Sequence, residues 1–390
     1  MVRGYNQKNH YARVTPCDQD YLRKMAKDTR RDALEYWFGT AVPREYKAMK
    51  AFDSEGVFIV DGTYIFVPLD NDRYENSSVI RFDDRGHPID QESYEKLPPK
   101  RQERCQLRRC YRAVGLSHTS PEKDYSLRCG ITVLQGKAAE SPCVWPLVKR
   151  LVDAVGPGIV KLLIHDRGLI DGATVTKLKR IGVDSLFPLK RGMDVWEDAK
   201  VLAAHDSSPW SRYEIPKPGQ ETTSTRKPES IRRREAKRQE TLHDRKKESM
   251  ENPRRTLVCI EYKWIEPSRV WESCEVPISV LLVKNHYSND DCIEWALGST
   301  RIFPLPFDMW KAYCLRSVVE EDHRQGKCFW DMTHVRSTSF SHVVTQIVFV
   351  ELAYSLVQIF LRRIGRNELT NATRERLLDY LIPQKKRIAL

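Results

Sequence analysis

The first half of the chain alternates between β-branched or aromatic runs and segments whose apolar residues have helical spacing. Strand patterns occupy Val57–Val67 and Leu127–Gly136, a short buried strand is expected at Lys161–His165, and two further strands are expected at Ser78–Phe82 and Ser185–Leu189. Each run is bounded by turn-forming residues, as strands commonly are. The pattern therefore predicts a sheet built from several short strands, with helices between them.

Helical periodicity accounts for much of the remaining apolar sequence. Residues 18–50 are charged and helical in pattern, and Cys143–Val155 ends at a Gly-Pro-Gly turn. A third helix is expected over Asp171–Gly182, and helical signals after Pro306 persist to about Arg363, as two long helices. Strands and helices mixed in this order favour an α/β fold in which helices cover both faces of a central sheet.

Residues 196–300 interrupt this order. Strand-like runs recur at Arg255–Trp264 and Ser273–Val283, and the stretch 217–255 is charged, with almost no large apolar residues. Such a composition indicates a solvated loop or charged helix, although its basic part, 226–255, could also contact phosphates non-specifically. The expected organisation is a helical N-terminal region (1–50), a first core segment (51–195), a β-rich insertion (196–300), a second core segment (301–365) and a helical C-terminal tail (366–390).

Composition and charge narrow the class of protein. The formal net charge of +12 over 390 residues favours a polyanionic partner, either nucleic acid or an acidic membrane surface. Val343–Leu361 resembles a membrane span, but it contains Gln346, Glu351 and Gln358, so a buried core helix explains it better. The ten cysteines have no zinc-ligand spacing, and the chain starts without an apolar signal segment. We therefore expect a cytoplasmic protein with reduced thiols and no membrane partner.

Two aspartates stand out against the strand pattern. Asp61 lies inside Val57–Val67, where a carboxylate is unfavourable unless it faces solvent or a ligand. Asp166 follows Lys161–His165 directly, at the end of a buried strand where open α/β sheets place their functional sites. Either residue alone could be structural: Asp61 as a solvated strand residue, and Asp166 as a turn former before Arg-Gly.

A third carboxylate belongs to a helical stripe. Tyr313, Arg316, Glu320 and Lys327 lie at offsets 0, 3, 7 and 14, so at the helical period they fall within a stripe about 60° wide. Arg324 falls on the same stripe, whereas Glu321 points roughly 100° away and is assigned a structural or rim role. Apolar residues occupy the opposite side. A solvated face of salt bridges would show the same pattern.

Taken together, the three carboxylates indicate metal chemistry. Two aspartates on strands and one glutamate on a helix can converge on divalent cations, because Mg²⁺ prefers oxygen ligands. Two such ions about 4 Å apart activate the attacking oxygen and stabilise the leaving oxygen in phosphoryl transfer. The cations that flank Glu320 suit DNA phosphates, which Arg can bind through two hydrogen bonds and Lys as a point charge.

These motifs resemble those of the DDE transposases of bacterial insertion sequences. The chain is similar in particular to the family 4 type, whose third motif is Tyr-x2-Arg-x3-Glu-x6-Lys, matched here by Tyr313, Arg316, Glu320 and Lys327. Asp61 in IVDGT matches the family's first aspartate, and Asp166 in IHDRG matches the second. The resemblance covers about residues 50–365, and includes the β-rich insertion.

This resemblance implies a fold, a cofactor and a reaction. The fold would be RNase H-like, and two Mg²⁺ or Mn²⁺ ions per active site would be held by Asp61, Asp166 and Glu320. The substrates would be the terminal inverted repeats of a mobile element and its target DNA. Water would first expose a 3′-hydroxyl, which would then attack a phosphodiester on the opposite strand or in target DNA. Tyr313, Arg316 and Lys327 would bind phosphates near the element end.

This chain also departs from the pattern of the family it resembles. In relatives that form a hairpin intermediate, a tryptophan on the last strand of the insertion stacks on a flipped base, and Trp295 matches that position, although it could equally be a packed strand residue. Some relatives have a second aromatic residue where this chain has Ser317. Only 60 residues precede Asp61, fewer than the family's usual DNA-binding region.

Two other functions are compatible with the same residues. The chain could be an RNase H-like nuclease without strand transfer, or a domesticated or truncated transposase that only binds DNA. Because a mobile element has two ends, a transposase is expected to act as a homodimer on DNA, in association with the nucleoid. Leu377, Leu378 and Leu381 are a candidate dimer contact, or else pack on the chain's own core.

Overall fold

The computed structural model describes residues 2–5, 12–15, 19–121, 125–215, 256–269, 271–335 and 337–370. The chain forms two compact units. The first comprises Met1–Pro188, Pro267–Ser279 and Gly298–Leu390, and the second comprises Leu189–Glu266 and Val280–Leu297. The whole basic stretch 217–255, and Leu377, Leu378 and Leu381 of the tail, lie outside the described residues.

The first unit is organised around a mixed sheet. Its order from one side is β7 (Ser126–Gln135), β6 (Gln106–Thr119), β3 (Val57–Val67), β8 (Leu162–His165) and β9 (Asp184–Pro188). β6 is antiparallel to both β3 and β7, whereas β3, β8 and β9 are parallel. This strand order, with helices between the later strands, confirms the mixed α/β, RNase H-like fold expected from the sequence.

β6 was not predicted from the sequence, although it is the longest strand of this sheet. Its first half contains Arg108, Arg109 and Arg112, which disrupt the apolar alternation that marks a strand. In the fold, two of these charges lie over aromatic rings of β3. The Arg108 guanidinium is 4.8 Å from the ring centre of Phe66, and that of Arg112 is 4.6 Å from the ring centre of Tyr64. Cation–π contacts of this kind accommodate arginine on a strand.

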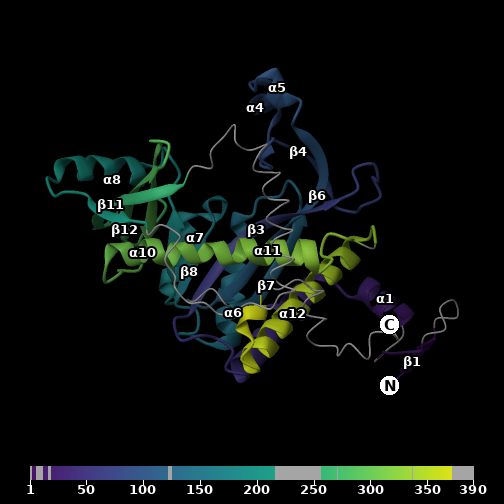
Figure 1. The fold of residues 1–390 in the computed structure, drawn as a ribbon. Coiled ribbons are helices and arrows are strands. Elements are labelled where there is room, and N and C mark those ends of the chain that lie inside the picture. Colours follow the sequence, from purple (N-terminus) through teal and green to yellow (C-terminus); the bar gives the residue numbers. More distant parts are fainter. Residues whose placement is uncertain are drawn as a thin grey trace, which may run out of the picture. The chain divides into compact units, whose positions relative to one another are not determined.

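Between β3 and β6 the chain forms an extension at the top of Figure 1. It contains β4 (Ser78–Phe82), β5 (Pro88–Ile89) and two short helices, α4 (Gln91–Glu95) and α5 (Pro99–Gln102). β4 is antiparallel to the outer part of β6, with Ser78 opposite Cys110. The expected strand at Ser78–Phe82 is therefore confirmed, as an outer strand of the sheet.

Helices before and between the strands supply much of the core. α1 (Gln19–Asp28), α2 (Arg31–Phe38) and α3 (Ala41–Ala48) account for the helical pattern of the N-terminal region, after a short hairpin of β1 (Val2–Tyr5) and β2 (Ala12–Thr15). α6 (Val144–Val155) follows the turn η1 (Ser141–Cys143) and buries Val144, Leu147, Val148, Leu151 and Val155, a single face at helical spacing. α7 (Gly172–Arg180) connects β8 to β9, after the turn η2 (Arg167–Leu169).

The C-terminal helices of the first unit are more broken than the sequence suggested. α10 (Pro306–Tyr313) and α11 (Ser317–Phe329) are joined by a 3-10 turn, η3 (Cys314–Arg316), and run end to end in Figure 1. The motif from Tyr313 to Lys327 therefore does not lie on one continuous α-helix. The chain stays in right-handed helical conformation through the turn, so the stripe is only locally distorted.

α12 (Phe340–Arg363) contains the apolar stretch that resembles a membrane span. By length and composition alone it could cross a membrane, but half of its most apolar window is buried inside the fold. Its buried face includes Glu351, Ser355 and Gln358, and each of these forms polar contacts within the first unit. These contacts support the expectation of a core helix. The turn η4 (Asn367–Leu369) follows it.

The second unit contains four strands and one helix among the described residues. The strand order is β10 (Ser211–Glu214), β11 (Leu257–Ser268), β12 (Ile278–Tyr287) and β13 (Cys292–Ser299), and the ends of β11, β12 and β13 extend beyond this unit. α8 (Asp194–His205) was not predicted. The buried Lys263 ammonium donates hydrogen bonds to the carbonyl oxygens of Ala203, Asp206 and Ser208, which stabilises the C-terminal end of α8.

Candidate active site

Asp61 is a buried carboxylate in the middle of the sheet. It lies on β3 with a residue exposure of 6%, and the Gly62 N–H donates a 2.9 Å hydrogen bond to its Oδ1. Burial raises the pKa of Asp61 to about 7; the positive charge of Arg316 opposes this, and the negative charges of Asp166 and Glu140 add to it. A carboxylate held in such a place is a candidate for a functional site.

Asp166 lies beside Asp61 because of the sheet register. β3 and β8 are parallel, with Val60 opposite His165, so the next residue of each strand is one of the two aspartates. The Asp166 side chain also caps the turn η2, where it accepts a hydrogen bond from the Gly168 N–H. The two aspartates predicted from the sequence therefore come from neighbouring strands on the same part of the sheet.

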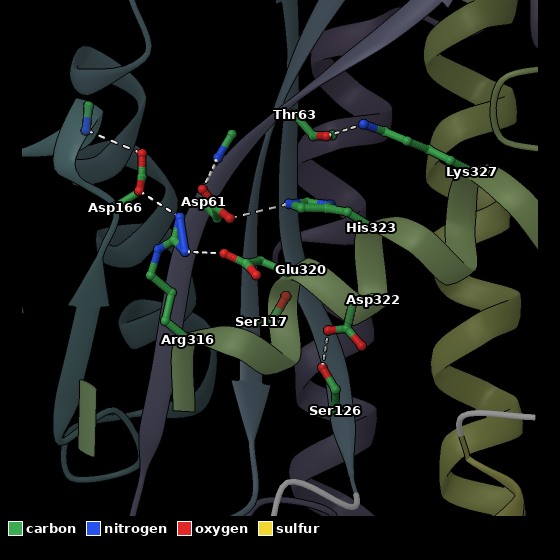
Figure 2. Close-up of polar contacts among 12 residues, drawn as sticks. Asp61, Thr63, Ser117, Ser126, Asp166, Arg316, Glu320, Asp322, His323 and Lys327 are labelled. Atoms are coloured by element: carbon green, nitrogen blue, oxygen red, sulfur yellow. Dashed lines mark hydrogen bonds and ion pairs between the residues drawn. The ribbon is translucent and has the colours of Figure 1, made fainter. Parts of the chain in front are cut away.

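Arg316 connects these aspartates to Glu320. Its Nη2 lies 2.8 Å from Asp166 Oδ1, and its Nη1 lies 2.5 Å from Glu320 Oε1, as Figure 2 shows. Burial alone would lower the pKa of Arg316, but the negative charges of Asp61, Asp166 and Glu320 outweigh it and raise the pKa. Arg316 is therefore the positive charge around which the three carboxylates gather.

The neighbouring Glu321 is engaged elsewhere. Its carboxylate forms hydrogen bonds with Arg324 and Gln325 of the same helix, at 2.5–2.7 Å. Arg324 is exposed, and its guanidinium also lies 5.1 Å from the ring centre of Phe329. Glu320, whose side chain is 63% exposed, is thus the glutamate of this pair that contacts the aspartate cluster through Arg316.

Two further residues of α11 reach toward β3. The Lys327 ammonium donates a hydrogen bond to the Thr63 hydroxyl, and burial lowers the pKa of Lys327 although Asp61 opposes this. His323 Nε2 lies 3.7 Å from Asp61 Oδ2 (Figure 2). Burial and three nearby cations lower the pKa of His323 well below its usual value, so the imidazole is neutral. His323 was not predicted from the sequence, although its spacing of three residues from Glu320 places it on a neighbouring position of the helix surface.

Tyr313, the first residue of the helical motif, is placed at the end of α10. Its side chain is part-buried, and burial raises the pKa of its phenol to about 12. Arg316 and Asp166 are among the charged groups that influence this pKa, so Tyr313 lies near the same cluster. The phenol therefore remains protonated at neutral pH and can donate a hydrogen bond.

The donor set fits a divalent cation in its chemistry. Asp61, Asp166 and Glu320 offer carboxylate oxygens, the ligands that Mg²⁺ and Mn²⁺ prefer. In the part of the chain that the structure describes, no three His, Cys, Asp or Glu side chains are already arranged to hold a metal ion. The Arg316 guanidinium bridges two of the three carboxylates instead. A positive charge thus already lies where these acidic groups meet.

A buried charge network anchors α11 behind this cluster. Asp322 lies two residues from Glu320, about 200° around the helix, and therefore faces the core. It accepts hydrogen bonds from Ser126 and Tyr354, at 2.5 and 2.8 Å. Arg128 of β7 lies 4.0 Å from Asp322 and 2.7 Å from Glu351 of α12. The network connects α11 to the sheet and to α12, so it fixes the helix that bears Glu320.

Trp295 belongs to the second unit. It lies on β13 and, with Trp196 and Trp210, lines a cavity of about 270 Å³. Lys200 and Lys284 line the same cavity, and the Lys284 ammonium lies 4.3 Å from the ring centre of Trp210. Aromatic and basic side chains are therefore combined around Trp295.

Comparison with known proteins identifies the family. A family model described as a transposase DDE domain matches residues 54–356, whereas no curated protein matches the chain. Among solved structures, the chain is similar to the piggyBac transposase in the cryo-EM structure of its synaptic complex with hairpin DNA, at 10% identity and a TM-score of 0.34. That similarity covers 85% of this chain and 55% of the other, so this chain spans about half the length of that protein. Because the family model matches most of the chain, including Asp61, Asp166 and Glu320, this protein belongs to the DDE transposase domain family.

Proposed function

We propose that this protein is a transposase of the insertion-sequence family 4 type, which cleaves DNA at transposon ends and transfers the cut strand into target DNA. The observation that supports this most is the gathering of Asp61, Asp166 and Glu320 around Arg316. All three carboxylates lie within the segment that the family model matches. The spacing from Tyr313 to Lys327 supports the assignment to this type.

Asp61, Asp166 and Glu320 would hold the divalent ions, Mg²⁺ or Mn²⁺. When bound, such ions supply an activated attacking oxygen and stabilise the leaving oxygen. Asp61 is suited to this task because its carboxylate is buried beside other negative groups, so a divalent cation would relieve an unfavourable charge. The neutral His323 beside it adds no competing positive charge.

Arg316, Lys327, Arg324 and Tyr313 would contact DNA. In this role Arg316 would exchange its carboxylate partners for a phosphate once a metal ion neutralises them, because a guanidinium binds either group through paired hydrogen bonds. Lys327 donates to a neutral hydroxyl, so its charge remains available for a phosphate near Asp61. In the second unit, the cavity around Trp295 would receive a nucleobase, because bases stack on aromatic rings and the flanking lysines attract the backbone.

The experiment that tests this function is cleavage and joining of DNA that bears the element's own ends, with and without Mg²⁺. A transposase cuts at the end and then joins the free 3′-hydroxyl to a target duplex. A nuclease without strand transfer would yield cut ends and no joined product. A protein that only binds DNA would shift the DNA in a gel and leave it intact. Cleavage that persists in excess chelator would contradict the proposal.

The first prediction concerns the basic residues of the motif. Lys327→Ala is expected to weaken binding of end DNA and to reduce the slope of log K against log salt by about one, since one phosphate contact is lost. Arg316→Ala should act in the same direction. The control is Lys149→Ala, which removes an exposed cation of α6 that is paired with Asp153. If the salt dependence of binding, measured by fluorescence anisotropy, is unchanged for Lys327→Ala, then Lys327 does not contact a DNA phosphate.

The second prediction is a dimer on DNA. A mobile element has two ends, so coordinated excision needs two active sites, and a two-fold dimer is the simplest symmetric arrangement that supplies them. Light scattering of the complex with DNA bearing one end is expected to give two protein chains and two DNA ends per particle. A complex that contains one chain throughout cleavage and joining would rule this out.

A further inference from the structure

We infer that Glu140 is a fourth carboxylate of the catalytic centre and contributes to divalent-ion binding between Asp61 and Asp166. Glu140 lies between β7 and α6, directly before the turn η1, in a stretch where the sequence pattern marks no site. The inference rests on the proposed function, because it assigns a residue to the metal site of that function. Four observations support it.

The first observation is the close approach of Glu140 to the backbone of β3. A Cβ atom placed on Gly62 would lie 2.1 Å from Glu140 Oε1 and 2.7 Å from its Cδ. Both distances are shorter than real Cβ contacts, so a side chain at position 62 would displace the Glu140 carboxylate from this place. Gly62 is also the residue whose N–H binds Asp61. The Glu140 carboxylate therefore lies against the peptide that orients Asp61.

The second observation places Glu140 near the turn that Asp166 caps. A Cβ atom on Gly168 would lie 3.6 Å from Asp166 Oδ2 and 3.7 Å from Glu140 Oε2. The two carboxylate oxygens thus flank the same point. Glu140 Oε2 lies 3.2 Å from the Cβ position of Gly62 and 3.7 Å from that of Gly168, so the carboxylate is near the backbone that follows each aspartate.

The third observation is electrostatic. Glu140, Asp166 and Asp61 are acidic groups whose charges act on one another, and Arg112 and Arg316 are the cations beside them. Arg112 pairs with Glu140, and Arg316 pairs with Asp166. A divalent ion bound between Asp61 and Asp166 would offset the remaining negative charge.

The fourth observation concerns Arg112, whose Nε lies 3.3 Å from Glu140 Oε1. Arg112 is also held by other groups: it donates to the Ala138 carbonyl oxygen at 3.0 Å and lies over the Tyr64 ring. Its position therefore does not depend on Glu140. Arg112 can therefore orient the Glu140 carboxylate through Oε1 and leave Oε2 available, and metal ligands are commonly oriented by such partners.

The test measures Mn²⁺ binding to the full chain without DNA, by titration calorimetry. Glu140→Gln keeps the size of the side chain and removes its charge. We expect its affinity for Mn²⁺ to fall about tenfold or more, the usual cost of losing a group that supports a metal site. Asp61→Asn is the positive control and should lose more. Glu321→Gln is the matched control on α11 and should bind Mn²⁺ as the wild type does, since Glu321 pairs with Arg324.

The outcomes separate this inference from the proposed function. If Glu140→Gln binds Mn²⁺ as tightly as the wild type while Asp61→Asn does not, Glu140 is only a partner of Arg112. The proposed function as a metal-dependent transposase is then unaffected. If the wild type and Asp61→Asn bind Mn²⁺ equally, the metal site itself is wrong, and the inference falls with it. Should Glu140→Gln not fold, as judged by circular dichroism, Glu140→Asp takes its place: withdrawing the carboxylate by one methylene should weaken binding, and wild-type affinity would overturn the inference.

Discussion

Asp61→Asn is expected to abolish Mg²⁺-dependent cleavage of end DNA while the protein still binds that DNA. Asparagine keeps the shape of the side chain but removes the charge that would hold the metal ion. The rate should fall by a factor on the order of 10³ or more, the size of loss seen when a group essential to the chemistry is removed. Single-turnover cleavage and anisotropy, measured on the same DNA, separate the two effects.

Replacements at the third carboxylate sharpen this prediction. Glu320→Gln should resemble Asp61→Asn, because Glu320 contacts the aspartate cluster through Arg316. Glu321→Gln should cleave close to the wild-type rate, because Glu321 is bound to Arg324 and Gln325. The reverse result, with Glu321→Gln inactive and Glu320→Gln active, would show that the third ligand is misassigned. Wild-type cleavage by Asp61→Asn would end the catalytic assignment of Asp61.

Arg128→Met is expected to destabilise the folded protein far more than the loss of any exposed ion pair. Arg128 is 2% exposed, and its guanidinium neutralises the buried carboxylates of Glu351 and Asp322. Removing one partner of a buried ion pair leaves uncompensated charge, which costs about 3–5 kcal/mol. Urea denaturation at pH 7 measures this loss. Arg324→Met, which breaks the exposed pair with Glu321, is the control and should cost no more than about 1 kcal/mol.

The pH dependence of Arg128→Met follows from the sign of the carboxylate shifts. Burial already raises the pKa values of Asp322 and Glu351 in the wild type, and the loss of Arg128 raises them further. An acid whose pKa is higher in the folded state takes up protons on folding, so stability falls as the pH rises above its unfolded pKa. The stability gap to wild type should therefore be larger at pH 8 than at pH 5. A gap that is equal at both values would show that Arg128 acts by packing alone.

This network also has a consequence for activity. Asp322 and Glu320 lie on the same helix and face opposite ways, so the contacts that bury Asp322 determine where Glu320 points. A weakened network should thus reduce cleavage more than DNA binding, since the phosphate contacts need less exact placement than the metal ligands. The fold therefore couples the stability of the core to the position of Glu320, the proposed third metal ligand.

Much of the fold was determined by local sequence pattern. The strand of Asp61, the helix that ends at Gly156 and the short strand before Asp166 lie where apolar spacing and turn residues predicted them, because these signals come from each segment's own burial. The order of the three carboxylates, and the spacing from Tyr313 to Lys327, were also sufficient to suggest the DDE transposase family, which the family model confirms.

The tertiary structure decided what depends on contacts between distant segments. β6 escaped prediction because its arginines are stabilised by aromatic rings of another strand, and a local pattern contains no such information. The pairing of Arg316 with Asp166 spans 150 residues. Glu140 and Arg128 are ordinary charged residues in sequence, and only the fold places one against Gly62 and the other between two buried carboxylates. The sequence thus indicated which residues could take part in the chemistry. Where these residues meet was decided by contacts between distant segments, since buried charges are stable only beside partners that the fold supplies.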